Sequence, residues 1–347
     1  MVRVPGHPFA VAVTADGRWA FVSLDNSVEV LRTGASPPPS RVHDVVLPGP
    51  AAGEALTRNG RYLLVASGSG AIVISVARAE QGNADAIVGT LASIGGGNGP
   101  VGGGIEVAVS PDDKFVFVTL ESRAAAAVFN LVRALASGFG RSSFVGDIPL
   151  GVSPVGMAFS PDGRSLYATS ELKSLRSAAG LLRGPGTLTV IDLHRAETDP
   201  AASIVSTVTA ECGPVRVITS ADGSDVWVTA RESNSLLCFS AAALRSDPAH
   251  ALIARVRVGD APVGLVLVRR GTRIVVADSN RFGAAGASSD LDVVDVAAAL
   301  AGRPAVIGWV SAGQFPREFA LEAGATTLLV TNYASQQLEA VGIAGLP

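Results

Sequence analysis

The sequence has few of the features by which several classes of protein are recognised. Its 347 residues contain two cysteines, Cys212 and Cys238, which excludes a disulfide framework and leaves free thiols as the expectation. No run of basic residues stands out and the formal net charge is −3. A basic surface for nucleic acid or for an anionic membrane is therefore not predicted. No stretch approaches 18 consecutive apolar residues, so no membrane-spanning segment is predicted either.

Two further absences concern cofactors and targeting. The four histidines are scattered along the chain, which argues against haem or copper sites that need dedicated histidine ligands. The segment from Met1 to Arg18 lacks a charged leader followed by a long apolar run. We therefore expect no signal peptide and a cytoplasmic location.

What the sequence has in quantity is apolar residues and short turns. Hydrophobic residues make up 48% of the chain and charged residues 16%, which excludes a disordered chain and allows a large core. No long amphipathic helical pattern is visible. Short apolar runs separated by regular turn signals instead favour an all-β fold.

The turns belong to a repeat, and its clearest copy covers Pro154–Asp192. Val155–Phe159 reads as a first strand, Ser160-Pro161-Asp162-Gly163 as a tight turn, and Ser165–Thr169 as the returning strand. A third strand follows at Leu188–Ile191. Similar units of about 50 residues begin at seven positions: Pro8, Ala51, Gly104, Pro154, Pro214, Pro262 and Pro316.

A fourth, outer strand is expected in each unit after an Ala-rich segment such as Val76–Gly82. The last unit stops after its third strand, Gln337–Val341, and Met1–Val4 could supply the strand that it lacks. Such a closure removes exposed sheet edges. We therefore predict one domain over residues 1–347, a seven-bladed β-propeller with four-stranded antiparallel blades closed by the N-terminal segment.

The turn motifs also carry a family resemblance. The Pro-x-x-h-Ala-h-Ser-Pro-Asp-Gly pattern, where h is apolar, is clearest at Ser160–Gly163 and Ser110–Asp113, with a later strand of the Val-x-Val-Ile-Asp type. Over essentially the full length it resembles the YVTN and lactonase-like seven-bladed propellers. WD repeats fit less well, because no Gly-His and Trp-Asp pairing recurs. The resemblance implies a lactone hydrolase, a lactone-forming isomerase or a binding protein.

Blade geometry predicts where a site would lie, since first strands begin and second strands end at the same mouth of the ring. Near the start of the first strand the copies read Ala10, Gly53, Glu106, Gly156, Arg216, Gly264 and Glu318. Just past the second strand they read Asp25, Gly68, Glu121, Glu171, Arg231, Ser279 and Tyr333. Arg123, Lys173, Asn280, Arg281, Arg317 and Asn332 are expected nearby.

These charged positions predict a cluster of carboxylates and arginines. Glu106, Glu121 and Glu171 are the candidate proton-transfer groups, with Glu106 and Glu121 as the preferred pair because they share a blade. The candidate substrate-binding residues are Arg216, Arg231, Arg123, Asn280, Arg281, Glu318 and Tyr333, with the arginines clamping a carboxylate. His7, directly before the first unit, is a further catalytic candidate, although the favoured interpretation is a solvated loop histidine. The alternative for the whole cluster is solvated loop ends and ion pairs between blades.

Three loops invite comparison with known motifs. Leu172–Gly186 and Ser279–Ser289 are longer than the corresponding loops of the other units. Such length is typical of a lid or a binding loop and equally of a tolerated insertion. Gly97–Gly102 matches G-x-G-x-x-G, but a strand follows it instead of the helix that a nucleotide site needs, so we expect a loop. No zinc spacing or EF-hand loop occurs. We expect no cofactor, and no spacing predicts a metal site, although funnel carboxylates could hold calcium.

The leading hypothesis is a lactonase-like enzyme that acts on a small carboxylated or lactone substrate at the mouth of the ring. The reaction would be hydrolysis, lactonisation or isomerisation by acid–base chemistry. The alternative is a non-catalytic propeller that binds a small ligand or a protein, which the lack of a recognised nucleophile or metal motif favours. The expected partner is a small molecule, and a monomer is favoured.

Overall fold

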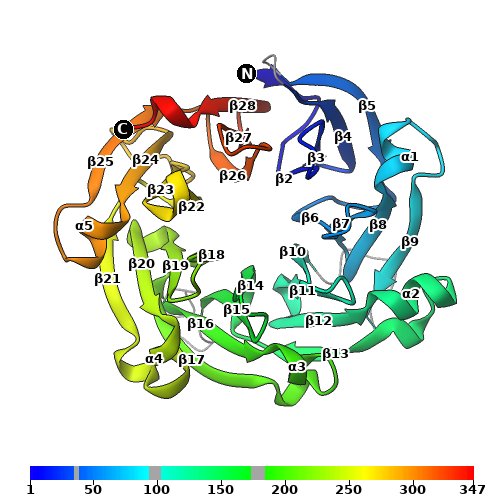
Figure 1. Ribbon diagram of the computed structural model, residues 1–347, viewed down its shortest axis with the longest axis horizontal. Helices are drawn as coiled ribbons and strands as arrows, with labels where there is room; N and C mark the ends of the chain where they lie inside the picture. The colour runs from blue at the N-terminus through cyan, green and yellow to red at the C-terminus, as the bar shows by residue number, and fades with distance from the viewer. Residues whose placement is uncertain (35–38, 94–102, 173–183) are drawn as a thin grey trace.

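Seven small β-sheets stand around a common axis in the computed structural model of the protein, which describes residues 1–34, 39–93, 103–172 and 184–347. Each sheet has four antiparallel strands, which follow chain order from the centre outward except in the sheet where β1 is the outermost strand, and Figure 1 shows the sheets as the blades of a ring. The predicted seven-bladed propeller is confirmed.

The strands fall into four concentric sets, numbered along the chain. The innermost are β2 (Val11–Val13), β6 (Glu54–Leu56), β10 (Gly104–Val109), β14 (Val152–Phe159), β18 (Pro214–Thr219), β22 (Pro262–Val268) and β26 (Pro316–Leu321). The second strands are β3 (Trp19–Leu24), β7 (Tyr62–Ser67), β11 (Phe115–Leu120), β15 (Ser165–Leu172), β19 (Asp225–Ala230), β23 (Arg273–Asp278) and β27 (Thr327–Asn332).

The third strands are β4 (Ser27–Arg32), β8 (Gly70–Ser75), β12 (Ala125–Asn130), β16 (Pro185–Asp192), β20 (Ser235–Ser240), β24 (Asp290–Asp295) and β28 (Gln337–Gly342). The outer strands are β5 (Ser40–Val46), β9 (Ile87–Ala92), β13 (Phe144–Pro149), β17 (Ile204–Cys212), β21 (Leu252–Arg257), β25 (Val306–Ser311) and β1 (Val2–Arg3). We number the blades one to seven in the order of their innermost strands.

Short helices lie between the third and outer strands of five blades, as the Ala-rich segments predict. They are α1 (Val76–Glu80), α2 (Leu131–Ser137), α3 (Leu193–Ala196), α4 (Ala241–Ser246) and α5 (Val296–Leu300). In the part of the chain that has been placed, no helix has the length and apolar character that crossing a membrane would require.

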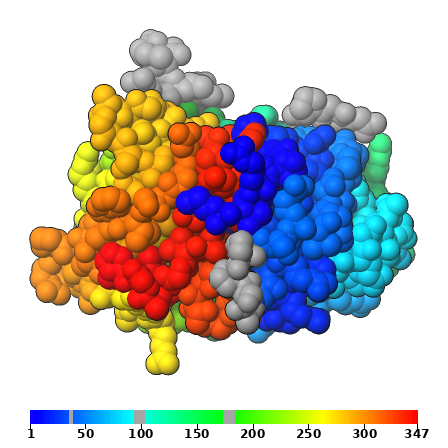
Figure 2. Space-filling view, turned by 90° about the horizontal axis from the view of Figure 1, so that it is seen from above, coloured from blue at the N-terminus to red at the C-terminus, as the bar shows by residue number. Residues whose placement is uncertain are grey.

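The N-terminal segment closes the ring. β1 pairs antiparallel with β28, with Val2 opposite Leu338 and Arg3 opposite Gln337. Figure 2 shows the first and last segments side by side on the surface. The expected closure by Met1–Val4 is therefore confirmed, and blade seven contains both ends of the described chain.

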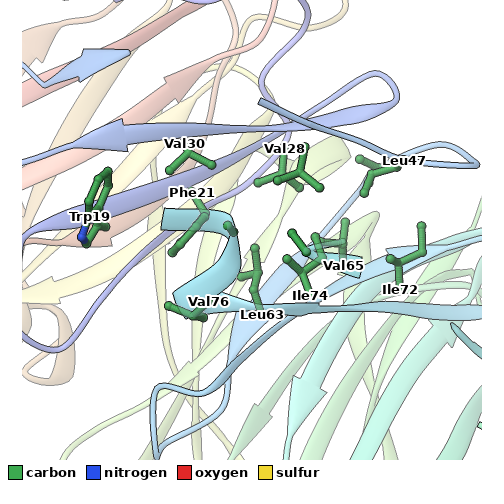
Figure 3. Packing of buried hydrophobic residues seen from close by; sticks show 14 residues of the cluster. Trp19, Phe21, Val28, Val30, Leu47, Leu63, Val65, Ile72, Ile74 and Val76 are labelled. Atoms are coloured by element: carbon green, nitrogen blue, oxygen red, sulfur yellow. The ribbon is translucent and has the colours of Figure 1, made fainter. Parts of the chain in front are cut away.

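The core lies between neighbouring blades. Figure 3 shows Phe21 and Val30 of blade one facing Leu63 and Ile74 of blade two, and all four are buried. Because every blade packs on two others, the alternating apolar residues of the second and third strands are covered on both faces. This packing fixes the positions of the innermost strands around the axis.

The two cysteines differ from one another. Cys238 is buried in β20, and burial raises the pKa of its thiol. Cys212 is half-buried and ends β17, so it belongs to the outer strand of blade four.

Candidate functional site

Hydroxyl side chains in the second strands hold the innermost strands at the centre of the ring. In blade four, the Thr169 hydroxyl accepts a hydrogen bond from the Gly156 N–H (2.9 Å) and donates to the Val215 carbonyl of blade five (3.1 Å). The same bridge to the following blade is made by Ser23, Thr119, Thr229 and Thr331. Blades two and six have Ala66 and Ala277 at this strand position.

These bridges bring the predicted first-strand positions into one ring. The N–H groups of Glu106, Arg216 and Glu318 each donate to the hydroxyl of their own blade. Glycine occupies the same position in blades two, four and six, between them. A Cβ on Gly53 would lie 2.6 Å from the Ile105 carbonyl oxygen, so only glycine leaves room for the neighbouring strand there. Small residues therefore alternate with charged ones around the axis.

Arg216 joins two glutamates across the centre of the ring. Its Nε donates to Glu318 of blade seven, and its Nη2 lies 3.4 Å from Oε2 of Glu106 of blade three. The Arg216 side chain is 8% exposed, while Glu106 and Glu318 keep about a fifth of theirs accessible. Desolvation, opposed by Arg216 and assisted by Glu318, raises the pKa of Glu106 to about 7.

Above this group lies a cavity of about 210 Å³ at the mouth of the ring. Its charged residues are Glu121, Glu171, Arg216, Arg231, Arg281 and Arg317, and its remaining lining is Phe9, Ile105, Val155, Val215, Val263, Phe315 and Tyr333. Four arginines thus face two glutamates in one pocket. Every blade except blade two contributes to this lining.

Arg317, like the exposed Arg281, has no carboxylate partner among the described residues. Its side chain is buried, and its Nε has no hydrogen-bond partner in the placed part of the chain. Its guanidinium lies over the Phe9 ring at 3.5 Å and near Phe315 and Tyr333. Burial, together with repulsion from Arg216, lowers the pKa of Arg317 to about 9, so it stays charged at neutral pH.

Arg231 and Glu171 form the second ion pair of the site, with 2.9 Å between Nη2 and Oε1. Burial raises the pKa of Glu171 against the opposing effect of Arg231. Burial likewise lowers the pKa of Arg231 against the opposing effect of Glu171. Phe282 covers the Arg231 guanidinium at 5.6 Å. The pair is therefore partly withdrawn from water, which strengthens its attraction.

His7 lies at the rim of the mouth. Its ring stacks on Tyr333 at 4.9 Å, and its Nδ1 lies 3.0 Å from Oδ1 of Asp25. Both His7 and Asp25 are exposed and neither lines the cavity. His7 therefore supports the position of Tyr333 from outside.

The other predicted site residues divide between the pocket and its surroundings. Glu121 lines the cavity but Glu106 does not, and the charged side chain that contacts Glu106 is Arg216, so the pocket lining does not bring the preferred pair Glu106 and Glu121 together. Arg123 points away from the pocket, where it contacts Asp147 of its own blade at 2.6 Å and Ser93, which follows β9 of blade two, at 2.7 Å. Asn280 bonds within its loop to the Ala287 carbonyl and Ala284 N–H. Three loop residues, Lys173, Arg176 and Arg183, and the segment Gly97–Gly102 lie outside the described residues.

Sequence reasoning missed three contributors. Phe9 and Phe315 line the pocket, and their place directly before the innermost strands of blades one and seven was the available signal. Glu54 in β6 stands opposite Val65, at the strand position where Val107 and Val217 stand in blades three and five. Both of its carboxylate oxygens are buried without a hydrogen-bond partner, and desolvation raises its pKa well above the usual value. A charged residue at that apolar position was the signal.

Two comparisons with known proteins bear on this chain. The family model of the choice-of-anchor I domain matches residues 54–211, which is the segment from β6 to β17 and so covers blades two, three and four. Among solved structures, a chain of Kuenenia stuttgartiensis hydrazine synthase superposes with a TM-score of 0.74 over 99% of this chain and 97% of that one, at 16% identity. This likeness concerns the fold. No curated protein matches the chain.

Proposed function

We propose that the mouth pocket binds a small organic anion, a carboxylate or a lactone that opens to one, and that a glutamate of the pocket moves a proton during its conversion. The observation that carries the proposal is Arg317, a buried guanidinium that an aromatic ring supports and no carboxylate neutralises in the placed part of the chain. A bound carboxylate would supply the missing partner.

The size and charge of the pocket support a small ligand. A cavity of about 210 Å³ is smaller than the roughly 300–1,000 Å³ typical of pockets for drug-sized ligands, so it suits a small acid better than a nucleotide or a peptide. Arg281 lines the cavity beside Arg317. Two guanidinium groups can contact the two oxygens of one carboxylate.

Glu171 is the residue best placed for proton transfer. It lines the pocket, and burial raises its pKa, which is the direction that favours a carboxylate in general acid–base catalysis. In lactone hydrolysis it would take a proton from the attacking water, the ring C–O bond would break, and that proton would go to the departing ring oxygen. Glu106, with a pKa of about 7, lies next along the axis and could exchange protons with water there.

The alternative is a non-catalytic propeller that binds the same anion. It is favoured by the ion pairs of the site, because Glu171 is held by Arg231 while Glu106 and Glu318 both contact Arg216. Glutamates engaged in this way position arginines for binding. They need not react themselves.

Thermal shift and NMR turnover assays against a panel of lactones and small hydroxy acids would separate these functions. The enzyme predicts that Glu171→Gln still binds the hit compound while turnover falls at least about 100-fold. Glu322→Gln, in the turn after β26, is the matched control and should keep both. Binding without turnover by the unaltered protein would favour the non-catalytic propeller. If no compound in the panel shifts the melting temperature, the anion-binding proposal is wrong.

A further inference from the structure

Three aspartates of blade six bring their carboxylates together away from the mouth pocket. Asp278 ends β23, while Asp290 and Asp292 lie in β24. One carboxylate oxygen from each lies within 4.8 Å of the other two. Asp278 is fully buried and Asp292 is nearly so. Three negative groups at such distances repel one another unless a positive charge or a proton joins them.

Asp278 is the unpartnered member of this cluster. Both of its carboxylate oxygens are buried and have no hydrogen-bond partner among the described residues. Asp292 accepts one bond, from the N–H of Gly259 at 3.0 Å. No ion pair to an arginine, lysine or histidine is formed by any of the three aspartates within the placed residues. Burying a carboxylate without a hydrogen-bond partner or a counter-charge costs free energy, so we expect a ligand to bind there.

Blade seven shows how the same place is satisfied without a ligand. There the corresponding strand positions hold Asn332, Gln337 and Glu339. The amide of Asn332 donates to Glu339 at 2.8 Å, and the N–H of Gly313 donates to it at 3.2 Å, just as Gly259 donates to Asp292. Blade six keeps the glycine bond but has Asp278 where the amide donor would be. Blade six therefore lacks the side-chain N–H donor that bonds to the carboxylate in blade seven.

We propose that Asp278, Asp290 and Asp292 bind a divalent cation of the size of calcium. Carboxylate oxygens are the ligands that such hard cations prefer, and two oxygens on opposite sides of a calcium ion lie about 4.8 Å apart. Beside Asp290 a surface depression of about 380 Å³, lined also by Asp260 and Ser288, gives the ion an entry path and room for coordinating water. The Asp260 carboxylate has a second buried oxygen without a partner in the described chain.

The proposed ion would sit at the base of the loop 279–289. This loop leaves β23 after Asp278 and enters β24 at Asp290, so two ligands flank it. It carries Arg281, which lines the mouth pocket, and Phe282, which covers Arg231. Binding of the ion would hold both ends of the loop together and would thereby fix the position of Arg281. The cation site itself does not depend on what the mouth pocket binds.

The competing arrangement is a proton shared between Asp278 and Asp292. Burial, with repulsion from Asp292 and Asp290, raises the pKa of Asp278 well above its usual value. A proton would satisfy one oxygen of this pair. It would leave the Asp290 carboxylate, which accepts a hydrogen bond from the Ser288 hydroxyl, without a counter-charge, whereas one divalent ion contacts all three side chains.

The test uses the full chain freed of metal with a chelator and then titrated with Ca²⁺ by isothermal titration calorimetry. We expect one ion per chain and a rise in melting temperature of at least about 3 °C at saturating Ca²⁺. Terbium provides a second readout, because Trp309 lies opposite Asp292 in the register and can sensitise Tb³⁺ emission. Absence of binding by both methods would overturn the proposal and leave the shared proton.

Variants locate the ion. Asp278→Asn recreates the amide of blade seven, so it should lose Ca²⁺ binding by at least about 100-fold while melting no lower than the metal-free parent protein. Asp290→Asn, at a less buried ligand, should weaken Ca²⁺ binding at least about tenfold. It tests the site independently if Asp278→Asn fails to fold. Asp199→Asn, an exposed aspartate after α3, is the control and should bind as the parent does. Unchanged binding by both site variants would place the ion elsewhere and refute the assignment.

Discussion

Arg317 holds its guanidinium 3.5 Å from the centre of the Phe9 ring, so that blade seven meets the segment entering blade one at the mouth of the propeller. An aromatic face attracts a cation by about 2 kcal/mol when water is excluded, yet it accepts none of the guanidinium N–H bonds. The charge is thereby held in place with its donors available. This relationship leads to the first prediction.

Arg317→Met should remove anion binding while keeping the packing on Phe9. A hydrogen bond to a charged partner contributes about 1.5–3 kcal/mol, so we expect the dissociation constant of the bound carboxylate to rise about 10- to 100-fold. Isothermal titration calorimetry measures it. Arg303→Met, at an exposed arginine after α5, serves as the control. Equal loss of affinity in both variants would mean that net charge, and not this contact, attracts the ligand.

The pKa of Glu106 makes stability depend on pH. The folded protein holds a proton on Glu106 between about pH 4.5 and pH 7 that the unfolded chain has lost, because burial raises this pKa from 4.5 to about 7. The contribution of this protonation to the free energy of unfolding therefore falls as the pH rises from about 4.5 to about 7. Above about pH 7 that contribution is lost completely.

Glu106→Gln abolishes that proton binding. Relative to the parent protein, the variant should gain up to about 3 kcal/mol in free energy of unfolding between pH 5 and pH 8, at about 1.4 kcal/mol for each unit of pKa. Urea denaturation at several pH values measures the difference. A difference that stays constant across this range would show that Glu106 is ionised throughout.

Glu54→Val should stabilise the protein at neutral pH. The substitution places at β6 the residue that blades three and five have at the same position, and it removes two buried oxygens that have no partner in the placed chain. We expect a gain of about 1–3 kcal/mol in the free energy of unfolding, from urea denaturation at pH 8. Val107→Glu is the reciprocal variant and should lose at least as much. A loss on Glu54→Val would mean that the carboxyl has a partner in solution.

Thr169→Val should weaken the junction between blades four and five. It removes one acceptor for the Gly156 N–H and one donor to the Val215 carbonyl, both of them buried, at a cost of about 2–3 kcal/mol. Chemical denaturation measures it. Thr326→Val, at an exposed turn threonine, should change stability by less than about 0.5 kcal/mol.

The sequence predicted the structure where a particular backbone geometry requires a particular residue type. Ser160-Pro161-Asp162-Gly163 and its copies predicted the turns, and so the number of blades and the end of each blade where charges gather. The charged residues at the equivalent positions Glu106, Arg216 and Glu318 predicted a cluster at the axis. Such features depend on contacts within one repeat or between equivalent positions of two repeats.

Partner choice could not be predicted in the same way. Arg216 bonds to Glu318, 102 residues away, and contacts Glu106 more weakly, which depends on side-chain lengths across the axis. Arg123 turns outward to Asp147 although it stands two residues from the pocket residue Glu121. The cluster around Asp278 depends on a loop that returns the chain to Asp290. The path of a loop has no periodic sequence pattern from which it could be predicted.

The two alanines in the ring of hydroxyl bridges make the junctions between blades unequal. Because Ala66 and Ala277 make no bridge, the hydroxyl link that five junctions share is missing between blades two and three and between blades six and seven. Blades two and three are joined instead by a hydrogen bond from the Gly53 N–H to the Ile105 carbonyl (2.7 Å). Within the described chain, the innermost strands of blades six and seven have neither of these links. We expect amide hydrogen exchange to be fastest along that seam, and mechanical pulling to part the ring there first.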